Sequence, residues 1–207
     1  MVDSLVSGIG MAIMGCRPFT RGHGRIIEQG LERHGDGNFY LVLGSADKPV
    51  SERCPWNINQ RMQMPRNVFG KRIKIIPIRD LGAEQGKNDW VDYVRAKLHA
   101  IGLKDPTDYY TGSRDDAEWY INRFYNEEFS PKCEGDAFKE RFVNDEGVTR
   151  KLHIIDRAGW YINGQEVSGT GVRTMIKMGN PEWKNYVHEE NWAFIEETFP
   201  EEYKVKD

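Results

Sequence analysis

Residues 11–33 read MAIMGCRPFTRGHGRIIEQGLER, and this stretch decides the fold class. Its first four residues are apolar without interruption, which is typical of a buried strand. From Gly24 to Arg33 the apolar residues Ile26, Ile27 and Leu31 follow the spacing of an amphipathic helix. A turn containing glycine separates the two. The stretch therefore predicts a strand, a turn and a helix, which is the first unit of an α/β fold.

The same alternation continues along the chain. Asn57 is a candidate N-cap, and Pro65 is expected to break or kink the helix that follows it. Strands that alternate with helices predict an α/β fold with a Rossmann-like parallel sheet and helices on both faces. Further strands are predicted at 39–43, 73–78, 109–111 and 152–155, and further helices at 57–69, 89–101, 115–124, 170–177 and 189–198.

We interpret residues 1–207 as a single domain, because this length suits one sizeable core. The segment 125–150 is charged and rich in turn residues, and we interpret it as an insertion. Two structures suit it, a helix near Phe138 or a hairpin around Gly147.

Composition excludes several classes of protein. A formal net charge of −3 argues against binding to duplex DNA, and we expect no nucleic-acid partner. No apolar run approaches the roughly 20 residues of a membrane-spanning helix, and the first residues do not resemble a signal peptide. Cys16, Cys54 and Cys133 have neither zinc-site nor CxxC spacing. We therefore expect a cytoplasmic protein with free thiols and no membrane partner, and leave its oligomeric state open, a homo-oligomer included.

The turn after the first strand, Gly15–His23, is the first candidate site. Open parallel sheets bind ligands beyond the carboxyl ends of their strands, and N–H groups at a helix start attract anions. Gly15 and Gly22 allow a phosphate to approach the backbone, and His23 can donate a hydrogen bond to its oxygens. Taken alone, the segment is either a phosphate site or an ordinary turn with a surface histidine.

The second candidate site is Val167–Arg173, which also leads into a predicted helix. Two hydroxyls, from Ser168 and Thr170, and the guanidinium of Arg173 suit a polyphosphate, since arginine donates in a fork and each hydroxyl donates singly. Taken alone, an ordinary capped helix start explains the segment equally well.

Together, in this order and near opposite ends of the chain, the two segments resemble the (H/T)xGH and SxTxxR signatures of the cytidylyltransferase-like nucleotidyltransferase superfamily. Within it, the chain is most similar to the archaeal-type nicotinamide-nucleotide adenylyltransferases, a domain that also occurs fused to a Nudix hydrolase. The chain departs from that pattern at Met14, Thr20, Cys54 and Ser113, where the family more often has Gly, His, Asn and His. Other matching segments are Gly44-Ser45-Ala46, Pro55-Trp56 with Gln60-Arg61, Pro77-Ile78-Arg79-Asp80 with Asn88 and Trp90, Gly112-Ser113-Arg114-Asp115-Asp116, and Asn180-Pro181-Glu182-Trp183.

The resemblance implies that the protein transfers the adenylyl group of ATP to nicotinamide mononucleotide (NMN), which yields NAD and pyrophosphate. It implies that Mg²⁺ is bound through the ATP phosphates, without a metal site of the protein itself. The implied catalytic residues are His23, Thr20 and Arg173. The implied ATP-binding residues are Gly15, Arg17, Gly22, Ser168, Thr170, Gly112 and Asp116. The implied substrate-binding residues are Arg61 for the phosphate of NMN, Asn88 for its carboxamide, Trp90 for its ring, and Ser45.

Alternatives stay open at this stage. The first alternative is transfer to another phosphorylated acceptor, such as phosphopantetheine, or transfer from CTP in place of ATP, although Asn88, Trp90 and the Gly44-Ser45-Ala46 turn favour NMN. A non-catalytic nucleotide-sensing module is the alternative from a different class. Trp90 also suits a core aromatic residue, and Arg61 a solvated charge. We interpret the remaining histidines as surface or satisfied polar residues: His34, His99, His153 and His188.

Overall fold

The computed structural model describes residues 8–81, 90–112, 139–145, 148–155, 161–162, 165–166 and 168–205. The main sheet has the strand order β3-β2-β1-β4-β6-β5, and β7 pairs separately with β8. The first five of these six strands are parallel, and only β5 at the edge is antiparallel to its neighbour. This confirms the predicted Rossmann-like parallel sheet. The strands are β1 (Gly10–Met14), β2 (Phe39–Leu43), β3 (Lys74–Pro77), β4 (Asp108–Thr111), β5 (Lys139–Asp145), β6 (Val148–Ile154), β7 (Tyr161–Ile162) and β8 (Gln165–Glu166).

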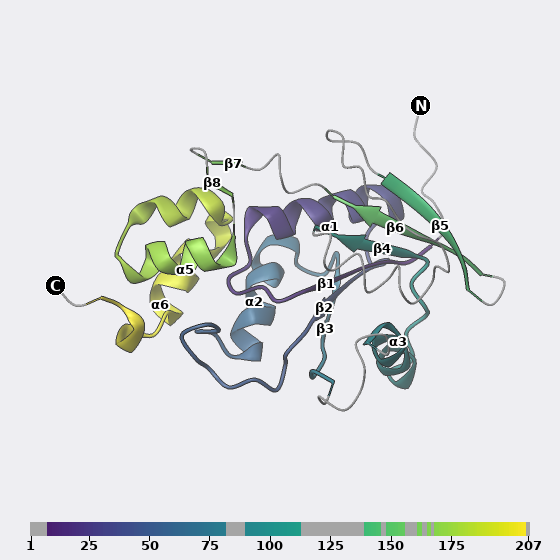
Figure 1. The fold of residues 1–207 in the computed structure, drawn as a ribbon, viewed down its shortest axis with the longest axis horizontal. Helices are drawn as coiled ribbons and strands as arrows, with labels where there is room; N and C mark the ends of the chain where they lie inside the picture. Colours follow the sequence, from purple (N-terminus) through teal and green to yellow (C-terminus); the bar gives the residue numbers. More distant parts are fainter. Residues whose placement is uncertain are drawn as a thin grey trace.

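Helices cover both faces of the sheet, as predicted. α1 (Arg21–His34) and α2 (Ile58–Phe69) pack on one face, and α3 (Trp90–Ala100) packs on the other (Figure 1). The alternation of side chains along β1 explains this, because Ala12 joins the core under α1 and α2 whereas Met11 joins the core under α3. Among the described residues, no helix is long and apolar enough to span a membrane.

The C-terminal elements gather at one end of the molecule, where the parallel strands finish (Figure 1). They include the helices that follow the second candidate motif. In chain order they are α5 (Gly169–Lys177), the 3-10 helices η2 (Pro181–Tyr186) and η3 (Glu189–Asn191), α6 (Trp192–Thr198) and η4 (Glu201–Tyr203).

Two helices differ from the prediction. The N-cap at Asn57 is confirmed, since its side chain accepts the N–H of Gln60 at 3.0 Å. Of the break or kink predicted at Pro65, the break is wrong, because α2 continues from Ile58 to Phe69 with Pro65 buried in it. Packing of that face against the core outweighs the loss of one backbone donor. The predicted terminal helix is divided into η3 and α6.

The segment 125–150 contains the hairpin that we gave as one of two alternatives. Asp145 pairs with Val148, and the antiparallel register runs back to Lys139 opposite Ile154. β5 and β6 therefore extend the main sheet. Phe138 and the helix predicted at 115–124 lie outside the described residues.

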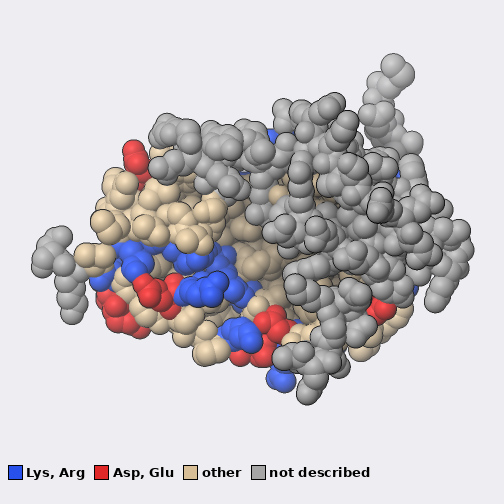
Figure 2. All heavy atoms as spheres, in the orientation of Figure 1, with Lys and Arg blue, Asp and Glu red and all other residues tan. Residues whose placement is uncertain are grey.

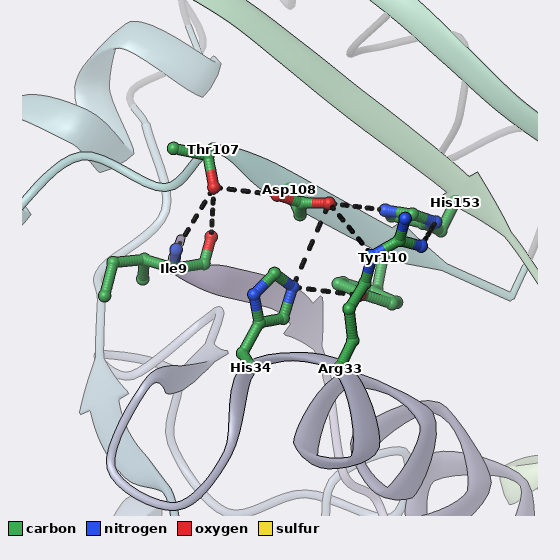
Figure 3. Close-up of polar contacts among 7 residues, drawn as sticks. All are labelled: Ile9, Arg33, His34, Thr107, Asp108, Tyr110 and His153. Carbon is green, nitrogen blue, oxygen red and sulfur yellow. Dashed lines mark hydrogen bonds and ion pairs between the residues drawn. The ribbon is translucent and has the colours of Figure 1, made fainter. Parts of the chain in front are cut away.

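A buried polar network lies at the amino end of β4 (Figure 3). The carboxylate of Asp108 accepts hydrogen bonds from His153 at 2.7 Å and from the Thr107 hydroxyl at 2.7 Å. His34, the last residue of α1, contacts the hydroxyl of Tyr110 at 3.0 Å. His34 and His153 are thus buried residues whose Nε2 atoms have polar partners, and neither is the surface residue that was one of the two interpretations made from the sequence. The network lies at the amino ends of the parallel strands, whereas Gly15–His23 follows the carboxyl end of β1.

Candidate functional site

A pocket of about 220 Å³ lies where the turn after β1 meets the start of α5. The structure therefore brings the two predicted motifs together, although Arg17 and Arg173 are 156 positions apart in the chain. The predicted residues that line the pocket are Gly15, Arg17, Thr20, Gly22, His23, Ser168, Thr170 and Arg173, and the other two lining residues are Cys16 and Gly169.

The two motifs contact each other directly. The guanidinium of Arg173 donates a hydrogen bond to the carbonyl oxygen of Arg17. A Cβ atom at Gly169 would lie 3.0 Å from that same oxygen, which is closer than most side chains tolerate. Glycine at position 169 therefore lets α5 begin against the turn after β1.

His23 lies in the first turn of α1, where a hydrogen bond orients its ring. Its Nδ1 lies 3.0 Å from the backbone nitrogen of Thr20 and 2.8 Å from the hydroxyl of Thr20. A backbone N–H can only donate, so Nδ1 accepts, and the neutral ring carries its hydrogen on Nε2. The histidine that lines the pocket is therefore prepared to donate a hydrogen bond from Nε2.

The backbone N–H and the hydroxyl of Thr20 both contact Nδ1 of His23. The residue is only 3% exposed although it lines the pocket, and its hydroxyl is within hydrogen-bond distance of His23. We therefore describe Thr20 as a residue that orients His23. Direct contact between its hydroxyl and a phosphate stays a prediction.

The start of α5 presents two hydroxyls and one guanidinium. Ser168 is the N-cap, and its Oγ accepts the N–H of Gly171 at 3.0 Å. The Oγ of Thr170 accepts a hydrogen bond from Arg173 at 3.0 Å. Both hydroxyls use oxygen lone pairs in these contacts, so each still has a hydrogen to donate to a ligand.

The pocket carries positive charge. Burial lowers the pKa of Arg173, and the neighbouring Arg17 and Arg53 cations lower it further, although it remains a cation at neutral pH. The Nε of Arg17 is buried without a hydrogen-bond partner among the described residues. Lysine and arginine side chains gather near α5 on the face shown in Figure 2. Since none of the described lining residues is acidic, the pocket suits an anion with several oxygens.

Arg61 lies beneath the site instead of facing a ligand. It is 1% exposed and donates to the carbonyl oxygens of Gly15 at 2.9 Å, Ser45 at 3.0 Å and Gly44 at 2.6 Å. The guanidinium that we expected to bind the phosphate of NMN is thus occupied by backbone carbonyls. In this structure Arg61 joins the loop after β1 to the loop after β2.

Replacing Arg61 with alanine should lower the free energy of unfolding by about 2–3 kcal/mol, because three carbonyl oxygens lose their donor. Chemical denaturation monitored by circular dichroism measures this. Arg72→Ala is the matched control, since Arg72 is half exposed and forms a surface ion pair with Asp36. Equal stability of the two variants would contradict the role of Arg61.

The other predicted site residues, three for the substrate and two for ATP, do not line the pocket as far as the structure describes them. Ser45 follows β2 and donates to the carboxylate of Asp80 at 2.9 Å. Trp90 begins α3, stacks on Tyr93 with 5.6 Å between ring centroids and packs against the core under α3. Gly112 is buried directly after β4. Asn88 and Asp116 lie outside the described residues.

Cys16 lines the pocket, although we did not predict it as a site residue. It stands inside the first motif, so its position in the sequence could have identified it. Burial raises the pKa of its thiol to about 12, despite the cations of Arg61 and Arg17. The thiol of Cys54 is also buried and donates to the carbonyl of Trp56.

We expect Cys16 and Cys54 to resist alkylation at pH 8, because both thiols are buried and the reagent cannot reach them in the folded protein. Mass spectrometry after iodoacetamide treatment measures this, in a Cys133→Ser variant that leaves only these two thiols. The unfolded protein should be labelled at both positions. Rapid labelling of Cys16 in the folded protein would contradict the prediction.

Comparison with known proteins extends the description of the fold. No family model matches the chain, and no curated protein matches it either. Among solved structures, a NadR protein in complex with NAD and AMP-PNP is 18% identical with a TM-score of 0.59, over 91% of this chain and 47% of that one. A NadR protein in complex with NR is 18% identical with a TM-score of 0.57, over 91% of this chain and 45% of that one.

A bifunctional NMN adenylyltransferase/ADP ribose pyrophosphatase from Francisella tularensis is 19% identical, over 57% of this chain and 35% of that one, with a TM-score of 0.49. The chain therefore spans less than half the length of each of these three structures. Its fold is the Rossmann-like α/β fold of the NadR structures. At this level of identity the likeness concerns the fold.

Proposed function

We propose that this protein transfers the adenylyl group of ATP to NMN, forming NAD and releasing pyrophosphate. The observation that carries the proposal is the pocket in which the segments Gly15–His23 and Ser168–Arg173 meet. Hydrogen-bond donors and cations line this pocket, and it lies beyond the carboxyl end of β1, where open parallel sheets bind nucleotides.

The chemistry follows from the groups in the pocket. An oxygen of the NMN phosphate attacks the α-phosphorus of ATP, and the bond from that phosphorus to the bridging oxygen breaks as pyrophosphate leaves. The attacking oxygen is already anionic, so no general base is needed. The protein then contributes positioning and stabilisation of charge. Mg²⁺ enters with ATP as part of the substrate, which suits a pocket whose described lining residues include no carboxylate.

Each motif has its own part in this proposal. The Nε2–H of His23 donates to an oxygen on the α-phosphate as negative charge builds in the transition state. Arg173, Ser168 and Thr170 hold the β- and γ-phosphates and stabilise the leaving pyrophosphate. Arg17, whose Nε has no partner among the described residues, adds a cation on the opposite wall.

The choice of NMN as acceptor rests on the family resemblance of Ser45, Asn88 and Trp90. An indole ring such as that of Trp90 attracts a cationic pyridine by about 0.5–2 kcal/mol. The solved NadR structures that share the fold hold NAD with AMP-PNP, or NR. The proposal assigns Gly112 and Asp116 to ATP, on the resemblance alone.

The test is incubation of the purified protein with Mg²⁺, ATP and NMN, followed by detection of NAD and pyrophosphate. Wild-type protein should form both, Arg173→Ala should form neither at a measurable rate, and the surface variant Arg72→Ala should match the wild type.

Two other outcomes would replace the proposal. Pyrophosphate release with phosphopantetheine or with CTP, but no NAD, would preserve nucleotidyl transfer and discard NMN. Binding of ATP without turnover of any acceptor would indicate a nucleotide-sensing module.

A further inference from the structure

Phe19 contacts two imidazole rings. Its ring stacks on His23, with centroids 5.7 Å apart and planes 21° apart. It stacks equally on His188, at 5.7 Å and 22°. Phe19 is completely buried, and Phe69 meets it edge-on at 6.1 Å. The three rings His23, Phe19 and His188 therefore form a stack that begins at the pocket and ends in the C-terminal segment.

His188 is held closely against the first turn of α1. A Cβ atom at Gly24 would lie 2.2 Å from the Nε2 of His188, so the imidazole fills the space that glycine leaves beside His23. That Nε2 is buried and has no hydrogen-bond partner among the described residues. Burial lowers the pKa of His188, and nearby Arg21 lowers it further, so the ring is neutral at pH 7. His188 therefore contributes a flat face instead of a charge or a hydrogen bond.

The stack complements the hydrogen bond that orients His23. The contact from Thr20 to Nδ1 sets the direction of the imidazole, but it does not stop the ring from tilting about that bond. Phe19 covers one face of the ring and blocks the tilt. His188 packs against the same Phe19 ring, so removing its imidazole would leave a space into which Phe19 can move.

We propose that His188 is a positioning residue for the adenylyl transfer described above, which holds the His23 ring in place through Phe19. The inference rests on the proposed function, since His23 is placed there on the α-phosphate of ATP. His188 lies outside the pocket lining and acts only through its neighbour.

The first test is steady-state kinetics of NAD formation. His188→Ala should lower kcat about tenfold and leave KM for ATP within about threefold, because small displacements of a catalytic group cost rate. His188→Phe keeps a flat aromatic face and should restore kcat to within about threefold of the wild type. His99→Ala is the matched control, since His99 is exposed and distant from the stack.

A second readout needs no turnover. Nitrogen NMR of the His23 ring in the full chain should show hydrogen on Nε2 in the wild type and in His188→Phe, and an altered spectrum in His188→Ala. Inorganic tripolyphosphate should bind His188→Ala with an affinity within about threefold of the wild type. Should the alanine variant not fold, His188→Leu fills the volume without a flat face and should still lower kcat about fivefold and alter the His23 spectrum.

The outcomes separate the two proposals. Unchanged kcat and an unchanged His23 spectrum in the folded His188→Ala or His188→Leu protein would overturn the role of His188. A wild-type protein that forms no NAD would overturn the proposed function, and the His23 spectra would then decide by themselves whether His188 holds the ring.

Discussion

Replacing His23 with alanine should lower kcat for NAD formation about 10²–10³-fold, the usual cost of removing one donor from a developing oxyanion. The reason is the geometry of the ring, in which Nδ1 accepts the backbone N–H of Thr20 and Nε2 is the donor. KM for ATP should change far less than kcat, because the donor matters most in the transition state. Initial-rate kinetics with purified variants measures both constants.

His23→Asn is the matched variant for this prediction. The asparagine oxygen lies near the place of Nδ1 and can still accept from the N–H of Thr20, but the side chain is too short to donate at the place of Nε2. We therefore expect His23→Asn to keep the stability of the wild type and to lose as much kcat as His23→Ala. Wild-type rates in either variant would show that His23 does not contact the reacting phosphate.

Replacing Asp108 with alanine should lower the free energy of unfolding by about 3–5 kcal/mol, the cost of breaking a buried polar pair. Asp108 is 3% exposed, accepts from His153 and Thr107, and lies 3.9 Å from the guanidinium of Arg33 (Figure 3). Removing its carboxylate leaves His153, Thr107 and Arg33 without this anionic partner. Denaturant titration measures the loss.

Asp36→Ala is the control for Asp108→Ala. Asp36 pairs with Arg72 at 2.9 Å, but its side chain is 64% exposed, so the loss should be at most about 1 kcal/mol. Equal losses in the two variants would show that the buried network does not stabilise the fold.

The same network predicts how stability depends on pH. Burial raises the pKa of Asp108, but the hydrogen bonds from His153 and Thr107 outweigh it, and the pKa lies below the ordinary 3.8. The unfolded chain therefore binds the proton first, so the stabilisation is complete above about pH 4 and is lost as the pH falls through the folded value. In Asp108→Asn, the free energy of unfolding should fall less steeply below pH 4.

His34 adds an earlier step to this profile. Burial lowers its pKa from 6.5, so the unfolded chain takes up a proton on His34 before the folded protein does. Stability should therefore begin to fall as the pH drops below 6.5. A flat free energy of unfolding between pH 6.5 and pH 5 would contradict this.

Much of the fold could be predicted because its signals are local. The apolar run Met11–Met14, the helical spacing of Ile26 and Leu31, and the Asn57 cap each depend on residues within a few positions of one another. The helix does not break at Pro65 because burial of this helix face, which is a tertiary property, outweighs a local rule. The segment that contains β5 was compatible with either a helix or a hairpin. The choice could not be made from the sequence, because β5 depends on pairing with β6.

Some residues of the candidate site could likewise be predicted from local sequence patterns, and others could not. Both motifs could be found from the sequence, since a turn with glycines or hydroxyls before a helix is a local pattern. The partners of Arg61 could not, because its three acceptors are backbone carbonyls from the loops after β1 and β2, and carbonyls carry no sequence signal. His188 was likewise missed, since its contact with Phe19 joins two residues far apart in the chain.

The sequence by itself determined the strands β1 to β4, the helices α1 to α3 and α5, and which short motifs carry donors for an anion, because side-chain periodicity and backbone turns are settled between near neighbours. Only the tertiary structure decided that Ser168–Arg173 closes on Gly15–His23, that Arg61 donates to the carbonyl of Gly15, and that His188 stacks on Phe19. These arrangements depend on packing between surfaces that the parallel sheet brings together, so no local pattern specifies them.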